Sequence, residues 1–394
     1  MNSFDIKHNR NHTRSVKWDS LDRTFQANDI IPLWIADMDF KSPEAVNEAL
    51  IERAKHGIYG YTIVDEDITD PIVKWIHQHH HWRIDSNWLS FSPSVVASIA
   101  MSVQAFTNPG DNILIQTPVY TPFFKIIKDH ERNLITSSLI DNQGHFEMDF
   151  DDLEDKFKNQ NITALLFCSP HNPVGRVWTK DELTRLANLC LQYDVLILSD
   201  EIHCDLIYEG HHHIPIASLS KEIAHQTITY MAPSKTFNMA GLQASYSIIE
   251  NDTLRRKQEF ALQKSGHKQL NTMGNMALEA VYKNGHTWLQ DLLSLLTQHK
   301  NYVIDTFNRE VPEIRIIEPE GTYLLWMDCS KLGFSSLELQ KFMIQKAKVG
   351  LNSGIAYGEE GSQFMRMNIA CHTDTLKTAV NQIIYAINHY KENK

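Results

Sequence analysis

Several segments place reactive or polar side chains directly after short apolar runs. ITALLFC is followed by SPHNPVGR, DVLILS by DEIH, TITYMA by PSKTFNMAG, NILIQ by TPVYTPF, and WLSFSP leads into SVVASIAMSVQAF. These segments supply an amine (Lys235), a carboxylate (Asp200), an amide (Asn172) and a phenol (Tyr120), which are groups that bind ligands or move protons. Each of them alone is also common as a turn former, a helix cap or a solvated side chain.

The elements that position these residues follow from the pattern of apolar residues. Between about residues 90 and 250, short runs rich in β-branched residues alternate with helical patterns. A capping box at Thr179 and Glu182 predicts the start of one of these helices. The alternation predicts an α/β fold with a mostly parallel sheet covered by helices, and ligands bind at the carboxyl ends of such strands. We expect strands buried on both faces at residues 112–116, 132–140, 162–169, 194–200, 225–232 and 241–249.

The pattern changes beyond about residue 285, where a long helical stretch is followed by short strands and a final helix after Thr373. This change predicts a second, smaller α+β domain. We expect residues 47–284 to form the large domain, residues 285–394 the small domain, and residues 1–46 a segment that packs with the small domain. Residues 44–56, EAVNEALIERAKH, have the pattern of a helix, and we expect this helix to end at Gly57.

Composition excludes several classes of protein. The 394 residues include 37 basic and 48 acidic side chains, a net charge of -11, without a basic tract for nucleic acid. No apolar run approaches the roughly 18 residues that a membrane helix needs. The five cysteines are separated and free of CxxC pairs, which argues against a disulfide framework and for a reducing compartment. Because the N-terminus is polar, we expect a cytoplasmic protein.

Histidine is unusually frequent, with 20 residues and two clusters, one at residues 77–81 and one at residues 211–213. Neither cluster has the HExxH spacing that places two metal ligands and a base on one helical face. We therefore expect solvated histidines and no metal. A metal-dependent hydrolase remains an alternative, which loss of activity to a chelator would support.

The order and separation of the motifs carry a resemblance that covers nearly the whole chain. SPHNPVGRVW (169–178), SDEIHCDL (199–206) and SKTFNMAGLQ (234–243) resemble the fold type I pyridoxal-phosphate enzymes, the aspartate aminotransferase superfamily. WIADMDF (34–40), YGYT (59–62), EGTYLLWMD (320–328) and FMRMNIAC (364–371) resemble its MalY/PatB branch, the cystathionine β-lyase type of C-S lyase. The resemblance implies a seven-stranded-type sheet in the large domain, pyridoxal 5'-phosphate as cofactor, and a homodimer with shared active sites.

The resemblance also implies a role for each residue at the strand ends. Lys235 would form a Schiff base with the cofactor aldehyde and then remove the substrate's α-proton. Asp200 would sit against the pyridine nitrogen, and Asn172 would donate to the phenolic oxygen. Tyr120 would lie against the ring face. His203 stands where aminotransferases carry a tyrosine, which favours the lyase branch.

The resemblance implies that four further residues lie around the cofactor phosphate. The backbone N–H groups of Val95 and Val96, at the start of a helix, would bind it, because a helix N-terminus favours an anion. Ser234 would add a hydroxyl. Tyr61 resembles the tyrosine that reaches across from the neighbouring subunit, where it would anchor the phosphate or donate a proton to the leaving sulfur.

Arg366 and Ala36 complete the implied site on the substrate side. Arg366 matches the family arginine that binds the substrate carboxylate, and the Ala36 N–H would be a second contact. The implied reaction cleaves L-cystathionine or another cysteine S-conjugate to a thiol, pyruvate and ammonia. An aminotransferase on the same fold is the first alternative, and a lyase with an additional regulatory binding role is another. The sequence does not select among the S-conjugates.

Overall fold

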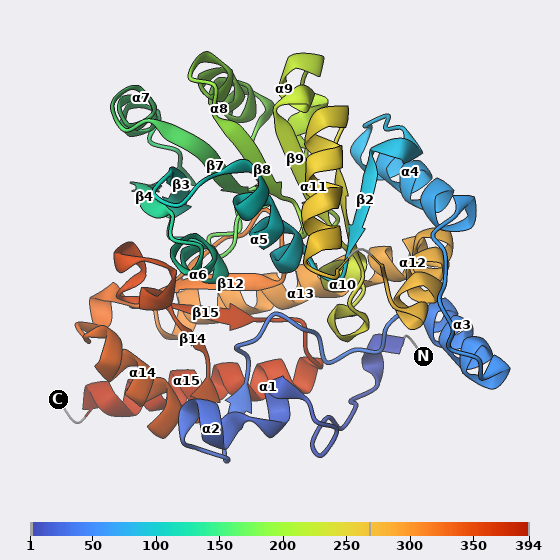
Figure 1. Cartoon of the computed structure of the whole chain (residues 1–394). Helices are drawn as coiled ribbons and strands as arrows, with labels where there is room; N and C mark the ends of the chain where they lie inside the picture. The colour runs from blue at the N-terminus through green and yellow to red at the C-terminus, as the bar shows by residue number, and fades with distance from the viewer. Residues whose placement is uncertain (1–2, 268, 393–394) are drawn as a thin grey trace.

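The computed structural model describes residues 3–267 and 269–392, and within them a large sheet runs in the order β2-β10-β9-β8-β7-β3-β4 (Figure 1). Strands β9, β8, β7, β3 and β4 pair in parallel, whereas β10 is antiparallel to both β9 and β2. The predicted, mostly parallel sheet is therefore confirmed. The strands are β2 (Leu89–Ser92), β3 (Asn112–Thr117), β4 (Asn133–Ser138), β7 (Ile162–Cys168), β8 (Leu196–Asp200), β9 (Thr227–Met231) and β10 (Ser245–Ile248).

Helices cover both faces of this sheet because successive strand residues point to opposite sides. In β7, Leu165 and Phe167 belong to one apolar cluster, whereas Ala164 and Leu166 belong to another. The first cluster includes residues of α7 (Phe150–Asn159), α8 (Lys180–Gln192) and α9 (Lys221–His225). The second includes residues of α5 (Val95–Phe106), α6 (Pro122–Asp129) and α11 (Asp252–Lys264).

Strand β4 departs from the prediction that all six runs are buried on both faces. It lies at the sheet edge and pairs only with β3 among the described strands. Asn133, Thr136 and Ser138 are exposed. An edge strand with alternating polar residues can face solvent, and its polar side chains limit pairing with other chains.

Two predicted helix ends are confirmed in detail. At α8, the Thr179 hydroxyl accepts a 3.2 Å hydrogen bond from the Glu182 backbone N–H, and the Glu182 carboxylate accepts a 2.8 Å bond from the Thr179 N–H. Helix α3 (Glu44–His56) ends at Gly57, whose φ of 73° lies in the left-handed region that glycine adopts readily. Helix α3 packs against α12 (Thr272–Asn284), which also contacts α4 (Glu66–His80).

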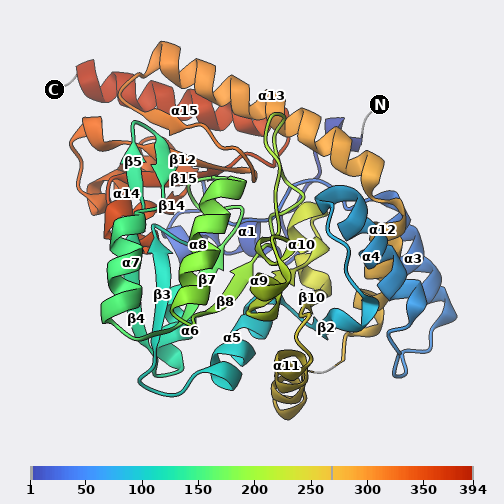
Figure 2. The ribbon, with the colours of Figure 1, turned by 90° about the horizontal axis from the view of Figure 1, so that it is seen from above.

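A smaller sheet in the order β11-β12-β15-β14 occupies the lower half of Figure 1. The long helices α13 and α15 run side by side along it (Figures 1 and 2). Near the N-terminus, α1 (Val16–Asp19) and α2 (Leu21–Phe25) precede β1 (Ile31–Pro32), which pairs in parallel with β13 (Val349–Gly350). The remaining elements are α13 (His286–Glu310), β11 (Arg315–Ile317), β12 (Leu324–Asp328), α14 (Ser336–Gln345), β14 (Asn352–Ser353), β15 (Phe364–Asn368) and α15 (Thr373–Glu392).

The pairing of β1 with β13 supports the proposed domain division, in which residues 1–46 pack with residues 285–394 and residues 47–284 form the large domain. Both sheets contribute to one continuous core that also includes α12 and α13. None of the helices in the described residues combines the length and the apolar character that crossing a membrane requires.

Candidate active site

Four adjacent strands end at one cavity. Asp200 is the last residue of β8, Asn172 follows β7, Tyr120 follows β3, and Lys235 lies in the short helix α10 (Pro233–Thr236) after β9. All four line the cavity, together with Val95, Val96, His203, Ser234 and Ala36. Every predicted cofactor residue except Tyr61 is therefore brought together, because neighbouring parallel strands deliver their carboxyl ends to one edge.

The amine of Lys235 is held in place by the backbone of Ala36. Its Nζ donates a 2.8 Å hydrogen bond to the Ala36 carbonyl oxygen, which also accepts a 3.1 Å bond from the Tyr323 hydroxyl. Burial, together with the charge of Arg366, lowers the pKa of Lys235 to about 8. This shift makes the neutral amine, the form that accepts a proton, far more populated near neutral pH than it is for an ordinary lysine.

Asp200 and His203 line the same cavity, and their pKa values are shifted in opposite directions. Burial raises the pKa of Asp200 to about 7, so a cation beside this carboxylate would be strongly favoured. Burial and the charges of Lys235 and Arg366 lower the pKa of His203 to about 3, which keeps its imidazole neutral. The Nδ1 atom of His203 is buried without a hydrogen-bond partner in the described residues. The cavity thus presents groups that a polar ligand would satisfy.

The first turn of α5 forms another part of the cavity wall. Ser94 precedes this helix, and its hydroxyl accepts a 3.2 Å hydrogen bond from the Ala97 N–H. The first N–H groups of a helix have no partner within the helix. Those of Val95 and Val96 are in this position, and both residues line the cavity beside Ser234. This wall can bind an anion.

Arg366 lies on β15 and reaches the site from the smaller sheet. Its guanidinium donates to the Asn172 side chain at 3.0 Å and to Asn352 at 2.7 Å. A third bond, of 2.8 Å, goes to the Trp34 carbonyl oxygen. The side chain is buried, and its Nε atom has no partner in the described residues. The arginine is therefore preorganised beside the cavity.

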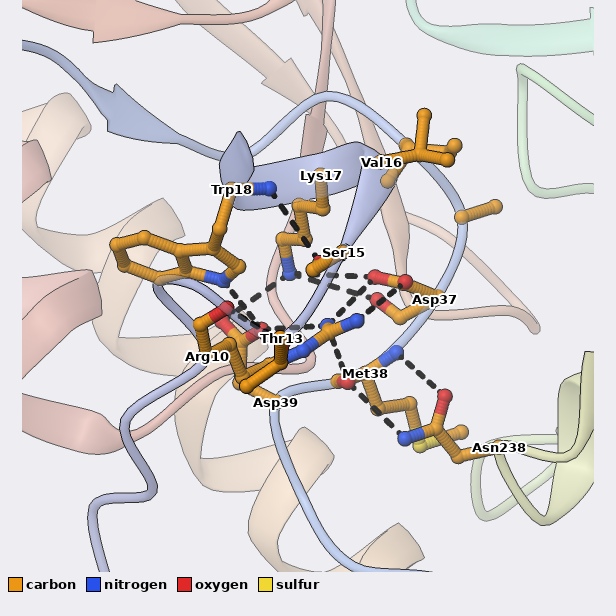
Figure 3. A network of polar contacts seen from close by, with 12 residues as sticks. Arg10, Thr13, Ser15, Val16, Lys17, Trp18, Asp37, Met38, Asp39 and Asn238 are labelled. Atoms are coloured by element: carbon orange, nitrogen blue, oxygen red, sulfur yellow. Dashed lines mark hydrogen bonds and ion pairs between the residues drawn. The ribbon is translucent and has the colours of Figure 1, made fainter. Parts of the chain in front are cut away.

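The segment that carries Ala36 is held by an ion-pair network that the sequence did not reveal (Figure 3). Arg10 donates to Asp37 at 2.8 and 3.0 Å, to the Met38 carbonyl at 2.9 Å and to Asp39 at 2.9 Å. Lys17 is fully buried, with its Nζ 3.1 Å from an Asp39 oxygen. Two cations and two carboxylates thus compensate one another between the N-terminal segment and the wall of the site.

Two asparagines also hold this segment, and both lie inside motifs that resemble the pyridoxal-phosphate enzymes. The amide of Asn238 accepts from the Met38 N–H at 2.9 Å and donates to the Met38 and Phe40 carbonyls at 3.0 and 2.8 Å (Figure 3). Asn368 donates to the Ile35 and Asp37 carbonyls at 2.7 and 2.6 Å. Their positions in SKTFN and FMRMN were the signal that could have identified them.

The prediction that the clustered histidines are solvated is wrong for His80 and His213. His80 is buried with its Nε2 2.9 Å from an Asp205 oxygen, and His213 is buried with its Nε2 2.8 Å from a Glu201 oxygen. Both acids follow β8, so their buried carboxylates need donors, which these histidines provide. The cluster members that are exposed are His77, His81, His211 and His212.

His80, Asp205 and Cys204 lie close enough together to hold a metal ion. However, one Asp205 oxygen already accepts from Trp75 Nε1 at 2.9 Å and pairs with His80, and the other accepts from the Thr236 hydroxyl at 3.0 Å. His80 and Asp205 are therefore engaged in a buried hydrogen-bond network with Trp75 and with Thr236 of the lysine-bearing helix.

This arrangement of lysine, aspartate and asparagine at adjacent strand ends agrees with a match between the aminotransferase class I and II family and residues 28–383. The chain belongs to this family. Within it, the chain is 42% identical to cystathionine β-lyase PatB of Bacillus subtilis, over 98% of this chain and all of that protein. Protein MalY of Escherichia coli is 33% identical over 96% of this chain and 97% of its own length.

A solved structure of a related protein supports the same assignment within the aminotransferase class I and II family. Cystalysin of Treponema denticola, whose crystal structure contains pyridoxal 5'-phosphate, superposes with a TM-score of 0.96. The two chains are 36% identical, and the match covers 99% of this chain and all of cystalysin. The resemblance predicted from the motifs is confirmed.

Proposed function

We propose that this protein is a pyridoxal-phosphate-dependent C-S β-lyase that cleaves L-cystathionine or another cysteine S-conjugate to a thiol, pyruvate and ammonia. The observation that carries the proposal is the convergence of Lys235, Asp200 and Asn172 on one cavity in a chain closely related to a cystathionine β-lyase. His203, rather than tyrosine, beside this set favours the lyase over an aminotransferase.

The residues of the cavity fit the cofactor. When bound, pyridoxal phosphate supplies an aldehyde that condenses with amines and a ring that stabilises negative charge at the substrate's α-carbon. Asp200 is a buried carboxylate at the cavity wall that forms no ion pair among the described residues, which suits a protonated ring nitrogen. Asn172 and His203 would bind the ring substituents, Tyr120 would cover one ring face, and the α5 N-terminus with Ser234 would hold the phosphate.

Lys235 and Arg366 would act on the substrate. The lysine amine, with its lowered pKa, would accept the proton from the α-carbon, and the carbonyl of Ala36 would orient it. Arg366 would bind the α-carboxylate, with the Ala36 N–H as a second contact. Loss of the α-proton then expels the thiolate from the β-carbon, and hydrolysis of the remaining enamine gives pyruvate and ammonia.

We propose in addition that the protein is a homodimer, and the position of Tyr61 supports this. Its side chain is 99% exposed and lies away from the cavity of its own chain, and Ile58, Tyr59 and Ile63 beside it are also exposed. A second copy covering this apolar segment would bring Tyr61 to the neighbouring cofactor phosphate or leaving sulfur. We also propose a cytoplasmic location, which the five buried free thiols support, since free cysteines are common in reducing compartments.

The proposal is tested by incubating purified holoenzyme with L-cystathionine and no keto acid. A lyase releases thiol and pyruvate over many turnovers, whereas an aminotransferase stops after one. Lys235→Ala should lose turnover by at least about a hundredfold, because a positioned acid or base contributes roughly that much. Normal pyruvate release by Lys235→Ala would reject the assignment.

A further inference from the structure

A second hollow opens from the lysine toward the N-terminal segment. It is a groove of about 660 Å³. Lys235 and Ala36 line it at the catalytic end, and Arg10 and Arg14 line it on the N-terminal segment. A substrate whose α-carbon lies at Lys235 would have this groove available for the group beyond its sulfur atom.

The groove carries an excess of positive charge although the whole chain is acidic. Its two acids, Asp37 and Asp39, are already paired with Arg10 and with the buried Lys17. Arg14 and Lys41 also line the groove, and both are exposed. Neither side chain has a hydrogen-bonding or acidic partner within residues 3–267 and 269–392. Two cations thus remain available to a ligand.

The backbone of Arg14 is fixed by its neighbours. The Thr13 hydroxyl donates a 2.6 Å hydrogen bond to the Arg10 carbonyl, and the Asp19 carboxylate accepts from the Ser15 N–H at 2.9 Å. Arg14 itself has a φ of 62°, a left-handed conformation that is unfavourable for a residue with a β-carbon. The guanidinium therefore extends from an ordered turn rather than from a loose tail.

We propose that Arg14, supported by Lys41, binds an anionic group at the distal end of the substrate, so that the preferred S-conjugates carry a carboxylate beyond the sulfur. This inference rests on the proposed lyase function. A guanidinium matches a carboxylate with two parallel hydrogen bonds, and a groove focuses the field of its unpaired cations on such a group. The distal carboxylate of cystathionine is one group of this chemistry.

The test compares two substrates of equal shape, S-carboxyethyl-L-cysteine and its neutral isostere S-carbamoylethyl-L-cysteine. Binding to the holoenzyme is followed by the change in cofactor absorbance, and turnover by pyruvate release. The wild type should prefer the carboxylate by about tenfold to a hundredfold, the range for a hydrogen bond to a charged group. Arg14→Gln should reduce this ratio to near one, Arg14→Lys should retain part of it, and added salt should lower it.

The matched control is Arg256→Gln, which removes the same charge from an exposed side chain on α11, outside the groove. It should leave the ratio unchanged. A wild-type ratio near one, or an Arg14→Gln ratio equal to that of the wild type, would overturn the inference. If binding shows the predicted ratio but no pyruvate is released from either compound, the anion subsite stands and the proposed lyase function fails.

Discussion

Arg366 donates a 3.0 Å hydrogen bond to Asn172, which joins the proposed substrate anchor on β15 to a proposed cofactor ligand that follows β7. Asn352 and the Trp34 carbonyl hold the same guanidinium. Its geometry is therefore set before substrate arrives, and binding the substrate carboxylate requires little reorganisation.

Replacing Arg366 with lysine should weaken substrate binding while the cofactor stays bound. Lysine keeps the charge but loses the planar fork that matches a carboxylate. We expect KM for a cysteine S-conjugate to rise by about tenfold or more, the value of a charged hydrogen bond. Steady-state kinetics measures KM, and the visible absorbance reports cofactor content. An unchanged KM would remove Arg366 from the substrate site.

Asp200→Asn should stabilise the apoprotein against unfolding but should reduce the turnover of the holoenzyme. Because burial raises the pKa of Asp200 to about 7, the folded apoprotein favours the protonated acid, and the contribution of this group to stability falls as pH rises from about 4 to about 7. At pH 8, Asp200→Asn should therefore unfold with a free energy up to about 4 kcal/mol higher than the wild type, and the gap should close near pH 4. The holoenzyme variant should instead lose turnover. If the wild-type and Asp200→Asn apoproteins gave equal unfolding curves at pH 8, the expected stabilisation would be contradicted.

Mixed dimers test whether Tyr61 acts on the partner's site. Tyr61→Ala and Lys235→Ala should each be nearly inactive, but a heterodimer of the two contains one site with both residues intact. Mixing and refolding equal amounts should restore roughly a quarter of wild-type activity, as random pairing of two kinds of subunit predicts. Each variant refolded alone is the control. No recovery would mean that Tyr61 does not act across a dimer interface.

The network behind Lys235 should matter for stability. Burial would raise the pKa of Asp205, but the hydrogen bonds from His80 and Trp75 dominate and lower it. Its contribution is thus present above the ordinary carboxyl pKa and lost as pH falls through the lower, folded-state pKa. Asp205→Ala should cost about 3 kcal/mol of unfolding free energy at pH 7, because it leaves His80, Trp75 and Thr236 without their acceptor.

Chemical denaturation of the holoenzyme measures this cost. The control is Asp129→Asn, which removes an exposed partner of Lys125 and should change stability by less than about 0.5 kcal/mol. If Asp205→Ala unfolds at the same denaturant concentration as this control, the buried network does not stabilise the fold.

The convergence of the candidate residues was predictable because each of them follows a short apolar strand, and a parallel sheet collects strand ends at one edge. This rule predicted that Lys235, Asp200 and Asn172 lie close together, whereas their proposed roles came from the resemblance of their motifs to the pyridoxal-phosphate enzymes. The helix limits at Thr179 and Gly57 were also predictable, because caps depend on residues close in sequence.

The features that the sequence did not predict depend on contacts between residues that lie far apart in the chain. His80 is buried because Asp205, which lies after a different element, needs a donor, and no local pattern signals that need. Lys17 resembles a solvated lysine in sequence, yet it is fully buried against Asp39. Likewise, the exposure of the polar residues of β4 follows from the place of this strand at the edge of the sheet, which its sequence alone does not reveal.

The pairing of β1 with β13 brings together strands from near the two ends of the chain. On the ribosome, the residues of the cofactor cavity emerge well before β13 and β15 have been made. Strand β1, which precedes Ala36, can therefore pair only after β13 has been synthesised, and Arg366 is synthesised later still, as part of β15. A chain that ended before β15 would thus possess Lys235 but lack Arg366, the proposed substrate anchor.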